Sequence, residues 1–136
     1  MVFLDANVLI YYLDETAEKN IETVRLLQNI IDEQEQVATS HHVIEEVLFV
    51  SSKIQPGIDL SMVVHRISEI PGIILAEPSP NLAFAKRYAT LSGELKMGIN
   101  DALILQLIID AGITKLFSYD KQLSSKARQL SIDNVA

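Results

Sequence analysis

The sequence contains no cysteine and no tryptophan, and it has few residues that break regular structure, with five glycines and four prolines in 136 residues. The absence of cysteine excludes disulfide bridges, thiolate zinc sites and cysteine nucleophiles, so any metal must be held by oxygen or histidine ligands. The composition, 49% hydrophobic and 21% charged, is typical of a globular chain rather than a disordered one. A chain of this length fits a single domain spanning residues 1–136.

A long apolar run and an excess of positive charge are also missing. The longest apolar run, ALILQLII at residues 102–109, is far below the roughly 20 residues that span a bilayer. Asp5 and Asp14 interrupt the apolar N-terminus, so we expect no signal peptide, no membrane association and a cytoplasmic location. The net charge of −7 argues against a broad phosphate-binding surface, although carboxylates that hold cations would contribute to this charge.

Hydrophobic periodicity predicts strands alternating with helices along the chain. Apolar segments predict strands at residues 2–4, 37–39, 73–75 and 115–119, and residues 134–135 leave little sequence for a fifth. Helices are predicted at residues 6–13, 17–31, 41–54, 60–70, 80–93, 100–111 and 121–130. No hairpin signal separates any two strands, so the pattern predicts an α/β fold: a three-layer α/β/α sandwich whose parallel sheet has four or five strands.

The same periodicity predicts which side chains of two helices face the core. In the helix at residues 17–31, we expect Ile21 and Val24 to lie on the buried side. In the helix at residues 41–54, we expect Val50 and Ile54 to continue the buried stripe.

Four acidic residues fall where this architecture would bring them together. Asp5 directly follows the first predicted strand and Asp120 follows the fourth, so both emerge at the carboxyl edge of a parallel sheet, where ligands bind in such folds. Asp101 stands at the start of the central apolar helix, whose N-terminus approaches the same edge. In the third predicted helix, Glu46 lies at the border of the buried stripe, whereas Glu45 points away from it.

Each of these acids also has a simpler structural interpretation. Asp5 and Asp120 are good N-caps for the helices that follow them. Asp101 would complement a helix dipole, and Glu46 would suit a half-exposed helix position. Four acids gathered at one edge would repel one another, however, and a cation between them relieves that repulsion. Oxygen ligands without cysteine or a neighbouring histidine suit Mg²⁺ or Mn²⁺, and Mg²⁺ sites of this kind commonly act on phosphate esters.

Three motifs in a fixed order carry a resemblance to a known family: VFLDANVLIYYL, TSHHVIEEVL and INDALILQLIIDAGITKLFSYD. Together they resemble the PIN domain, in particular the VapC-type toxin ribonucleases of toxin–antitoxin pairs. The resemblance extends over nearly the whole chain. It implies a Mg²⁺- or Mn²⁺-dependent endoribonuclease that hydrolyses RNA phosphodiester bonds, forms a homodimer and is held inactive by an antitoxin protein.

The resemblance also implies roles for individual residues. The aspartate of the family's D-x-N motif falls on Asp5, with Asn7 as the accompanying amide. The family's glutamate falls on Glu46, the residue that helical phase also selects. The aspartate of the D-A-L-I motif falls on Asp101, and the one that closes the last strand motif falls on Asp120, with Ser118 where Thr is more usual. The expected catalytic residues are therefore Asp5, Glu46, Asp101 and Asp120, with Asp5, Asp101 and Asp120 as metal ligands and Asn7 and Ser118 in support.

Other functions fit parts of this pattern. A haloacid-dehalogenase-like phosphatase usually has a second Asp two residues after the first, where this chain has Asn7. A phosphorylated receiver domain has an acceptor Asp after its third strand, where this chain has Ala76 and Glu77. The remaining alternative is a PIN-like module that binds RNA or protein without cleavage, with apolar surfaces near Ile10–Leu13 and Leu26–Ile31 for a partner.

The histidines and several lysines carry less information. His41 and His42 stand at a predicted helix start, where we expect capping or surface residues rather than metal ligands. Lys96 and Lys121 flank the proposed site in the sequence, where a lysine can contact phosphate, but ordinary surface positions are the simpler interpretation of both.

Overall fold

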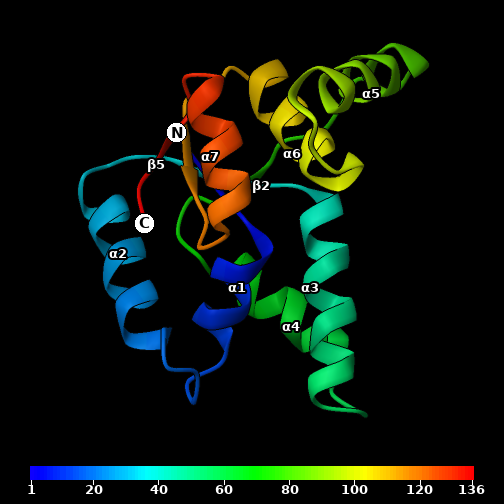
Figure 1. Ribbon diagram of the computed structural model, residues 1–136. Helices are drawn as coiled ribbons and strands as arrows, with labels where there is room; N and C mark the ends of the chain where they lie inside the picture. The colour runs from blue at the N-terminus through cyan, green and yellow to red at the C-terminus, as the bar shows by residue number, and fades with distance from the viewer.

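The computed structural model describes all 136 residues and places five short strands in one parallel sheet, with seven helices around it (Figure 1). The strand order is β3-β2-β1-β4-β5. This arrangement confirms the predicted α/β class and its parallel sheet. The strands are β1 (Val2–Leu4), β2 (Val37–Thr39), β3 (Ile74–Leu75), β4 (Lys115–Phe117) and β5 (Asp133–Asn134). The helices are α1 (Ala6–Leu13), α2 (Asn20–Asp32), α3 (His41–Ile54), α4 (Leu60–Ser68), α5 (Leu82–Leu95), α6 (Ile99–Asp110) and α7 (Lys121–Gln129).

The central strand is β1, which pairs with β2 on one side and β4 on the other. All residues of β1 and β2 are buried, as expected for parallel strands covered on both faces. Leu4 lies opposite Phe117 in the register of β1 with β4, so these two strands end level with each other. The residues that follow them, Asp5 and Ser118, therefore emerge side by side at the carboxyl edge of the sheet.

Three helices begin near this edge with a polar side chain that caps the first turn. The Asp5 carboxylate accepts a hydrogen bond from the next backbone N–H at the start of α1, and the Asp120 carboxylate caps α7. The Ser40 hydroxyl caps α3 by accepting from the Val43 N–H at 3.2 Å. Helix α6 differs from these three, because it begins after Gly98 and has no side-chain cap.

Helix α6 runs through the hydrophobic core, as its apolar sequence predicts. Leu105, Leu107 and Ile108 are all buried, whereas Ile109 is 40% exposed on the outer side of the helix. The helix packs along α5, and Figure 1 shows the two as a pair at one end of the molecule. Gly112 follows the helix with a φ of 70°, a left-handed conformation that glycine adopts without steric strain, and this ends the helix as predicted.

The predicted buried faces of α2 and α3 were wrong in part. Ile21 is 82% exposed and Val24 is 42% exposed, because α2 lies at one side of the molecule and buries only a narrow stripe (Figure 1). Ile54 is 66% exposed and Val50 is half-buried, because the C-terminal part of α3 extends away from the sheet beside α4 (Figure 1). The apolar face of each helix is therefore wider than the part of that face that neighbouring elements cover.

Several predicted boundaries also moved by a few residues. Helix α5 begins after Asn81, whose side chain caps it, and continues through Gly93 to Leu95 instead of ending there. Helix α4 ends earlier than predicted, at Ser68, and α6 begins one residue earlier, at Ile99. Strand β3 has only two residues, both exposed, and the fifth strand is present as a two-residue β5 at the other edge.

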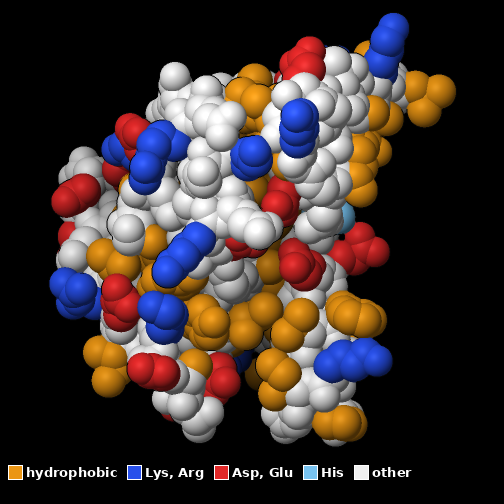
Figure 2. Space-filling view, in the orientation of Figure 1, with side chains coloured by type: hydrophobic (Ala, Val, Ile, Leu, Met, Phe, Trp, Pro, Cys, Tyr) orange, Lys and Arg blue, Asp and Glu red, His pale blue; other side chains and the backbone are white.

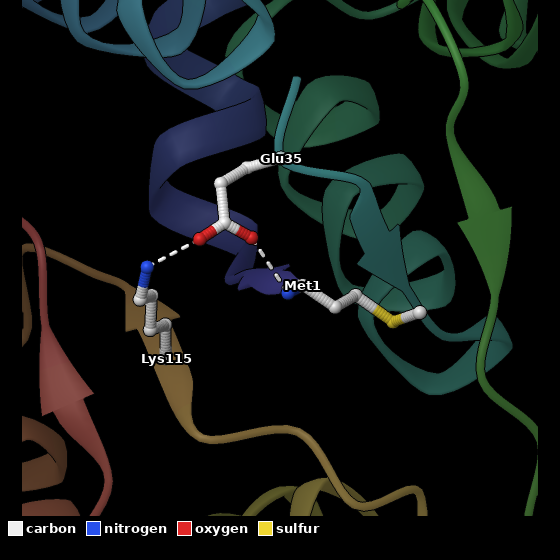
Figure 3. A network of polar contacts seen from close by, with 3 residues as sticks. All are labelled: Met1, Glu35 and Lys115. Atoms are coloured by element: carbon white, nitrogen blue, oxygen red, sulfur yellow. Dashed lines mark hydrogen bonds and ion pairs between the residues drawn. The ribbon is translucent and has the colours of Figure 1, made fainter. Parts of the chain in front are cut away.

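An ionic cluster joins the opposite, amino end of the sheet. The Glu35 carboxylate accepts hydrogen bonds from the Met1 amino group at 2.7 Å and from the Lys115 ammonium group (Figure 3). These contacts lower the pKa of Glu35 from its ordinary 4.5 to about 2, with the Lys115 hydrogen bond as the largest cause. The cluster therefore ties the segment before β2 to the first residues of β1 and β4.

The structure has no helix that is both long enough and apolar enough to cross a membrane.

Candidate active site

A pocket of about 180 Å³ lies at the carboxyl edge of the sheet, among α1, α3, α6 and α7. In Figure 2, Asp and Glu side chains gather in the middle of the face where the first turns of α1, α3 and α7 meet. The structure brings all four predicted acids into this pocket, and Glu45 is not among the residues that line it. The lining residues are Asp5, Ala6, Asn7, Ile10, Glu46, Asn100, Asp101, Ile104, Asp120 and Leu123.

Asp5 is the most buried of the four acids, with 6% of its surface exposed. Its Oδ1 atom accepts from the Ala6 N–H at 2.8 Å, and its Oδ2 atom accepts from the Ser118 hydroxyl at 2.6 Å. Burial raises the pKa of Asp5, the two hydrogen bonds act in the opposite direction, and the nearby Asp120 charge raises it further. The strand-to-helix turn therefore fixes the direction of this carboxylate before any ligand arrives.

The buried Ser118 hydroxyl connects three groups of the pocket. The hydroxyl donates a hydrogen bond to Asp5, and its oxygen accepts hydrogen bonds from the Asp120 N–H at 3.0 Å and from the Asn7 side-chain amide at 3.4 Å. The Asn7 Oδ1 atom in turn accepts from the Tyr119 N–H at 3.1 Å. These bonds hold the turn after β4 against the turn after β1, with Ser118 in direct contact with Asp5 and Asp120 and Asn7 in contact with Ser118.

Asp120 combines a structural role with a position in the pocket. Its Oδ1 atom accepts from the Gln122 and Leu123 N–H groups at 2.9 and 3.0 Å, so it caps α7 as the simpler interpretation predicts. Its Oδ2 atom makes no hydrogen bond within the chain, and the residue lines the pocket. One oxygen of this carboxylate is therefore available to a ligand while the other holds the helix.

Asp101 and Glu46 face the pocket without any hydrogen-bond or ion-pair partner for their carboxylates in the chain. Burial raises the pKa of Asp101, and the charges of Asp120 and Asp5 raise it further. Removal from water also raises the pKa of Glu46, with the Asp5 charge as the next largest cause. Glu46 is an exposed residue overall, and it lines the pocket at the molecular surface from the border of the buried stripe of α3.

The donor atoms of the pocket fit a small divalent cation. Carboxylate oxygens and two side-chain amides line it, and no Lys or Arg reaches it to neutralise the acids. The raised pKa values reflect burial together with mutual repulsion, both of which a cation would offset. No three acidic or histidine groups lie close enough to ligate one ion directly. Mg²⁺ does not require three such ligands, because it keeps several waters and usually takes only one or two protein carboxylates.

Two asparagines of the site escaped the sequence analysis. Asn100 lines the pocket beside Asp101, and only this adjacency in the sequence points to it. Asn134, in β5, accepts from the Ser118 N–H at 3.2 Å and donates to the Ser118 carbonyl at 2.8 Å and the Ser124 hydroxyl at 2.6 Å. No local pattern marks Asn134, because its role depends on a strand pairing that only the fold creates.

Comparisons with known proteins agree with the fold. A family model described as the PIN domain matches residues 2–129. VapC20 of Mycobacterium tuberculosis, a sarcin-ricin loop cleaving toxin, is 16% identical with a TM-score of 0.70, over 92% of this chain and 94% of that one. VapBC2 from Rickettsia felis, bound to a promoter DNA fragment, is 19% identical with a TM-score of 0.68, over 100% of both chains. FitAcB from Neisseria gonorrhoeae is 16% identical with a TM-score of 0.68, over 100% of this chain and 97% of that one.

At these identities the likeness shows the fold alone. The sequence has no significant match among curated proteins.

Proposed function

Because the chain belongs to the PIN domain family, we propose that it is a metal-dependent endoribonuclease that hydrolyses RNA phosphodiester bonds in the cytoplasm, with residues 1–136 as one domain. One observation carries this proposal: four carboxylates from four separate segments line a single pocket at the carboxyl edge of the sheet. Helix caps and surface acids have no need to converge on one pocket. The four carboxylates repel one another there, and a bound cation would offset that repulsion.

We propose that Asp5, Asp101 and Asp120 would hold a Mg²⁺ or Mn²⁺ ion, at most two of them directly and the remainder through waters that the ion keeps. When bound, such an ion supplies activation of a water molecule and neutralisation of charge on the phosphate. Glu46, on the open side of the pocket, is suited to orient the attacking water, because its carboxylate has no partner within the chain. Ser118, with Asn7 behind it, holds Asp5 in a fixed direction through its 2.6 Å hydrogen bond.

Replacing the acids one at a time tests this proposal. We expect Asp101→Asn to lower Mn²⁺-dependent cleavage of RNA at least about 100-fold, since loss of a ligand should exceed the 10- to 100-fold cost of losing an outer-shell partner. Glu46→Gln should also impair cleavage, whereas its neighbour Glu45→Gln should leave it unchanged, because Glu45 does not line the pocket. Cleavage is followed with a labelled RNA in the presence and absence of Mn²⁺.

Circular dichroism provides the control for folding in these variants. Full activity in a folded Asp101→Asn protein would refute the metal-site assignment. A wild-type protein that binds RNA without cutting it, with or without Mn²⁺, would instead identify a binding module.

The two rival enzyme classes find less support in the structure. The Asn7 side chain, in the position of the second aspartate of the phosphatases, is bonded to Ser118 and to the Tyr119 backbone. The residue after β3 is a buried alanine, Ala76, where a receiver domain has its acceptor aspartate.

We further propose that the chain is the toxin of a toxin–antitoxin pair and that the toxin unit is a homodimer. VapBC2 and FitAcB, which share its fold, support this proposal. A groove of about 740 Å³ between α1, α3 and α4 offers a site for the antitoxin. Its apolar lining comes from Ile10, Leu13, Ile54, Ile58, Met62 and Val63. In Figure 2, hydrophobic side chains border the hollow between the lower parts of α1 and α3.

The groove fits an apolar peptide segment that carries basic residues. Asp14, Glu15 and Asp59 stand along it, and its one cation, Arg66, is engaged with the Leu13 carbonyl at 3.1 Å. The predicted partner surface at Ile10–Leu13 thus borders the groove, whereas Leu26–Ile31 lies outside it.

A substitution in the groove separates partner binding from catalysis. We expect Ile54→Arg, at a 66% exposed position, to weaken capture of the co-expressed neighbouring-gene product at least about tenfold without loss of RNA cleavage. Ile21→Arg, on the similarly exposed face of α2, is the matched control. Capture that survives Ile54→Arg but not Ile21→Arg would place the partner elsewhere. Light scattering of the isolated chain measures whether it is a homodimer.

A further inference from the structure

Two walls of the carboxylate pocket belong to different helices, and a single side-chain hydrogen bond joins those helices. Glu46 projects from α3 and Asp101 from α6. The His42 Nε2 atom of α3 bonds to the Asn100 Oδ1 atom of α6. The structure contains no other side-chain hydrogen bond between α3 and α6, although both helices pack into the same hydrophobic core. This pair is therefore the one polar contact between the two helices beside the pocket.

The bond lies directly beside the two acids. His42 precedes Glu46 by four residues, one turn of α3, so the two side chains lie on the same face of the helix. Asn100 directly precedes Asp101 and itself lines the pocket. The His42–Asn100 pair thus connects the turn that holds one acid to the turn that holds the other.

Helix α6 needs such an external contact more than its neighbours do. Asp5, Ser40 and Asp120 cap the first turns of α1, α3 and α7, whereas α6 begins after Gly98 without a side-chain cap. Asn100, in the first turn of α6, makes no capping bond and points its amide oxygen at His42 instead. The contact from α3 holds the Asn100 side chain of this turn, although it satisfies none of the backbone N–H groups that a cap would satisfy.

Repulsion within the pocket acts against this arrangement. Burial raises the pKa of Asp101, and neighbouring carboxylates raise it further. Removal from water raises the pKa of Glu46, the Asp5 charge adds to it, and His42 acts in the opposite direction. Without a tie between the helices, the like charges on α3 and α6 would favour a wider pocket.

We propose that His42 is a positioning residue, which through Asn100 sets the separation of Glu46 and Asp101 for a hydrated divalent cation. This inference rests on the proposed nuclease function and gives a role to a histidine whose sequence context indicates only a cap or a surface residue. His42 holds the carboxylates in place and does not itself touch the reacting atoms.

Three substitutions test this role. His42→Phe removes the hydrogen bond, His42→Gln retains an N–H donor, and His41→Phe is the matched control, because the adjacent His41 faces Glu77 at 3.4 Å instead. We expect His42→Phe to bind Mn²⁺ about tenfold more weakly by calorimetry, the lower end of the effect of losing an outer-shell contact. Its kcat for RNA should fall while KM stays unchanged. His42→Gln should recover much of both properties, and His41→Phe should match the wild type.

A double-mutant cycle with Asn100→Ala separates this role from general destabilisation. The double variant should bind Mn²⁺ no more weakly than either single variant, since both changes remove the same contact. Independently of metal, nitrogen NMR should show the His42 ring with its proton on Nε2, and Asn100→Ala should shift that signal.

The outcomes distinguish this inference from the proposed function. If the wild type binds Mn²⁺ and cleaves RNA while His42→Phe keeps full affinity, the positioning role is refuted and the nuclease proposal stands. A wild type that neither binds Mn²⁺ nor cleaves RNA would overturn both. Additive losses in the double-mutant cycle would also refute coupling through Asn100.

Discussion

At the scale of single residues, the pocket carboxylates combine structural bonds with positions suited to chemistry. Asp120 caps α7 with one oxygen and leaves the other free of hydrogen bonds. Asp5 caps α1 with one oxygen and accepts a hydrogen bond from the Ser118 hydroxyl with the other. Capping a helix therefore does not exclude either residue from binding a ligand, the alternative that local sequence leaves open.

Ser118 is the residue whose loss should disturb this arrangement most. Ser118→Ala leaves the Asp120 N–H without its acceptor and removes the donor from Asp5, so we expect the free energy of unfolding to fall by about 1–3 kcal/mol. Ser118→Thr keeps the hydroxyl and is the control. Denaturant unfolding measures both variants. Equal stability of the alanine and threonine proteins would show that the hydroxyl network contributes little.

At the scale of secondary-structure elements, the sequence predicted the type and order of the helices and strands better than it predicted which face of each helix is buried. The apolar strands β1 and β2 and the capped helices α1 and α3 begin and end where predicted, because strand burial and caps at Asp5 and Ser40 are local signals. The exposed Ile21 on α2 and Ile54 on α3 were predicted wrongly, because burial depends on the neighbours that a helix meets. Asn134 was missed for the same reason, because its partner Ser118 follows a different strand, β4.

The carboxylate pocket could be predicted to the level of its acids. The order of the parallel strands predicted Asp5 and Asp120 at one edge of the sheet, and helix position and helical phase predicted Asp101 and Glu46, all of which line the same pocket. The His42–Asn100 contact was out of reach, because the motifs that contain these residues give them no role and the two helices approach each other only in the folded chain.

Helix α6 offers a direct test of how burial stabilises an element. Ile108 and Ile109 are adjacent and chemically identical, but Ile108 is fully buried and Ile109 is 40% exposed. We expect Ile108→Ala to lower the free energy of unfolding by about 2–5 kcal/mol, the usual cost of such a core truncation. The same change at Ile109 should cost under about 1 kcal/mol, because most surface substitutions have small effects. Similar losses from urea unfolding of the two variants would contradict the assigned orientation of α6.

At the scale of the whole molecule, the sheet has one acidic end with unneutralised carboxylates and one end where charges are paired. The pocket acids lie beyond the carboxyl ends of β1 and β4, and the Met1–Glu35–Lys115 cluster lies at their amino ends (Figure 3). A pH change therefore acts on the two ends in opposite directions. The raised pKa values at the pocket weaken the fold as pH rises, and the lowered pKa of Glu35 strengthens it.

The Glu35 cluster gives a pH prediction. A carboxyl whose pKa is lowered on folding, here from 4.5 to about 2, stabilises the fold fully above pH 4.5 and loses this effect as pH falls towards 2. Glu35→Gln should therefore lower Tm at neutral pH, and its difference from the wild type should shrink below pH 4.5. Thermal unfolding across this range measures the difference, with Glu18→Gln, an exposed acid of the loop before α2, as the control. A difference that persists unchanged near pH 2 would contradict the prediction.

The double use of Asp5 and Asp120 has a consequence for descent as well as for chemistry. An asparagine caps a helix about as well as an aspartate does, and a single base change converts one codon into the other. The chain can therefore lose its charge at these positions while its helices keep their caps. Under the function proposed above, such variants would keep the fold, and with it the groove for a partner, while losing cleavage of RNA.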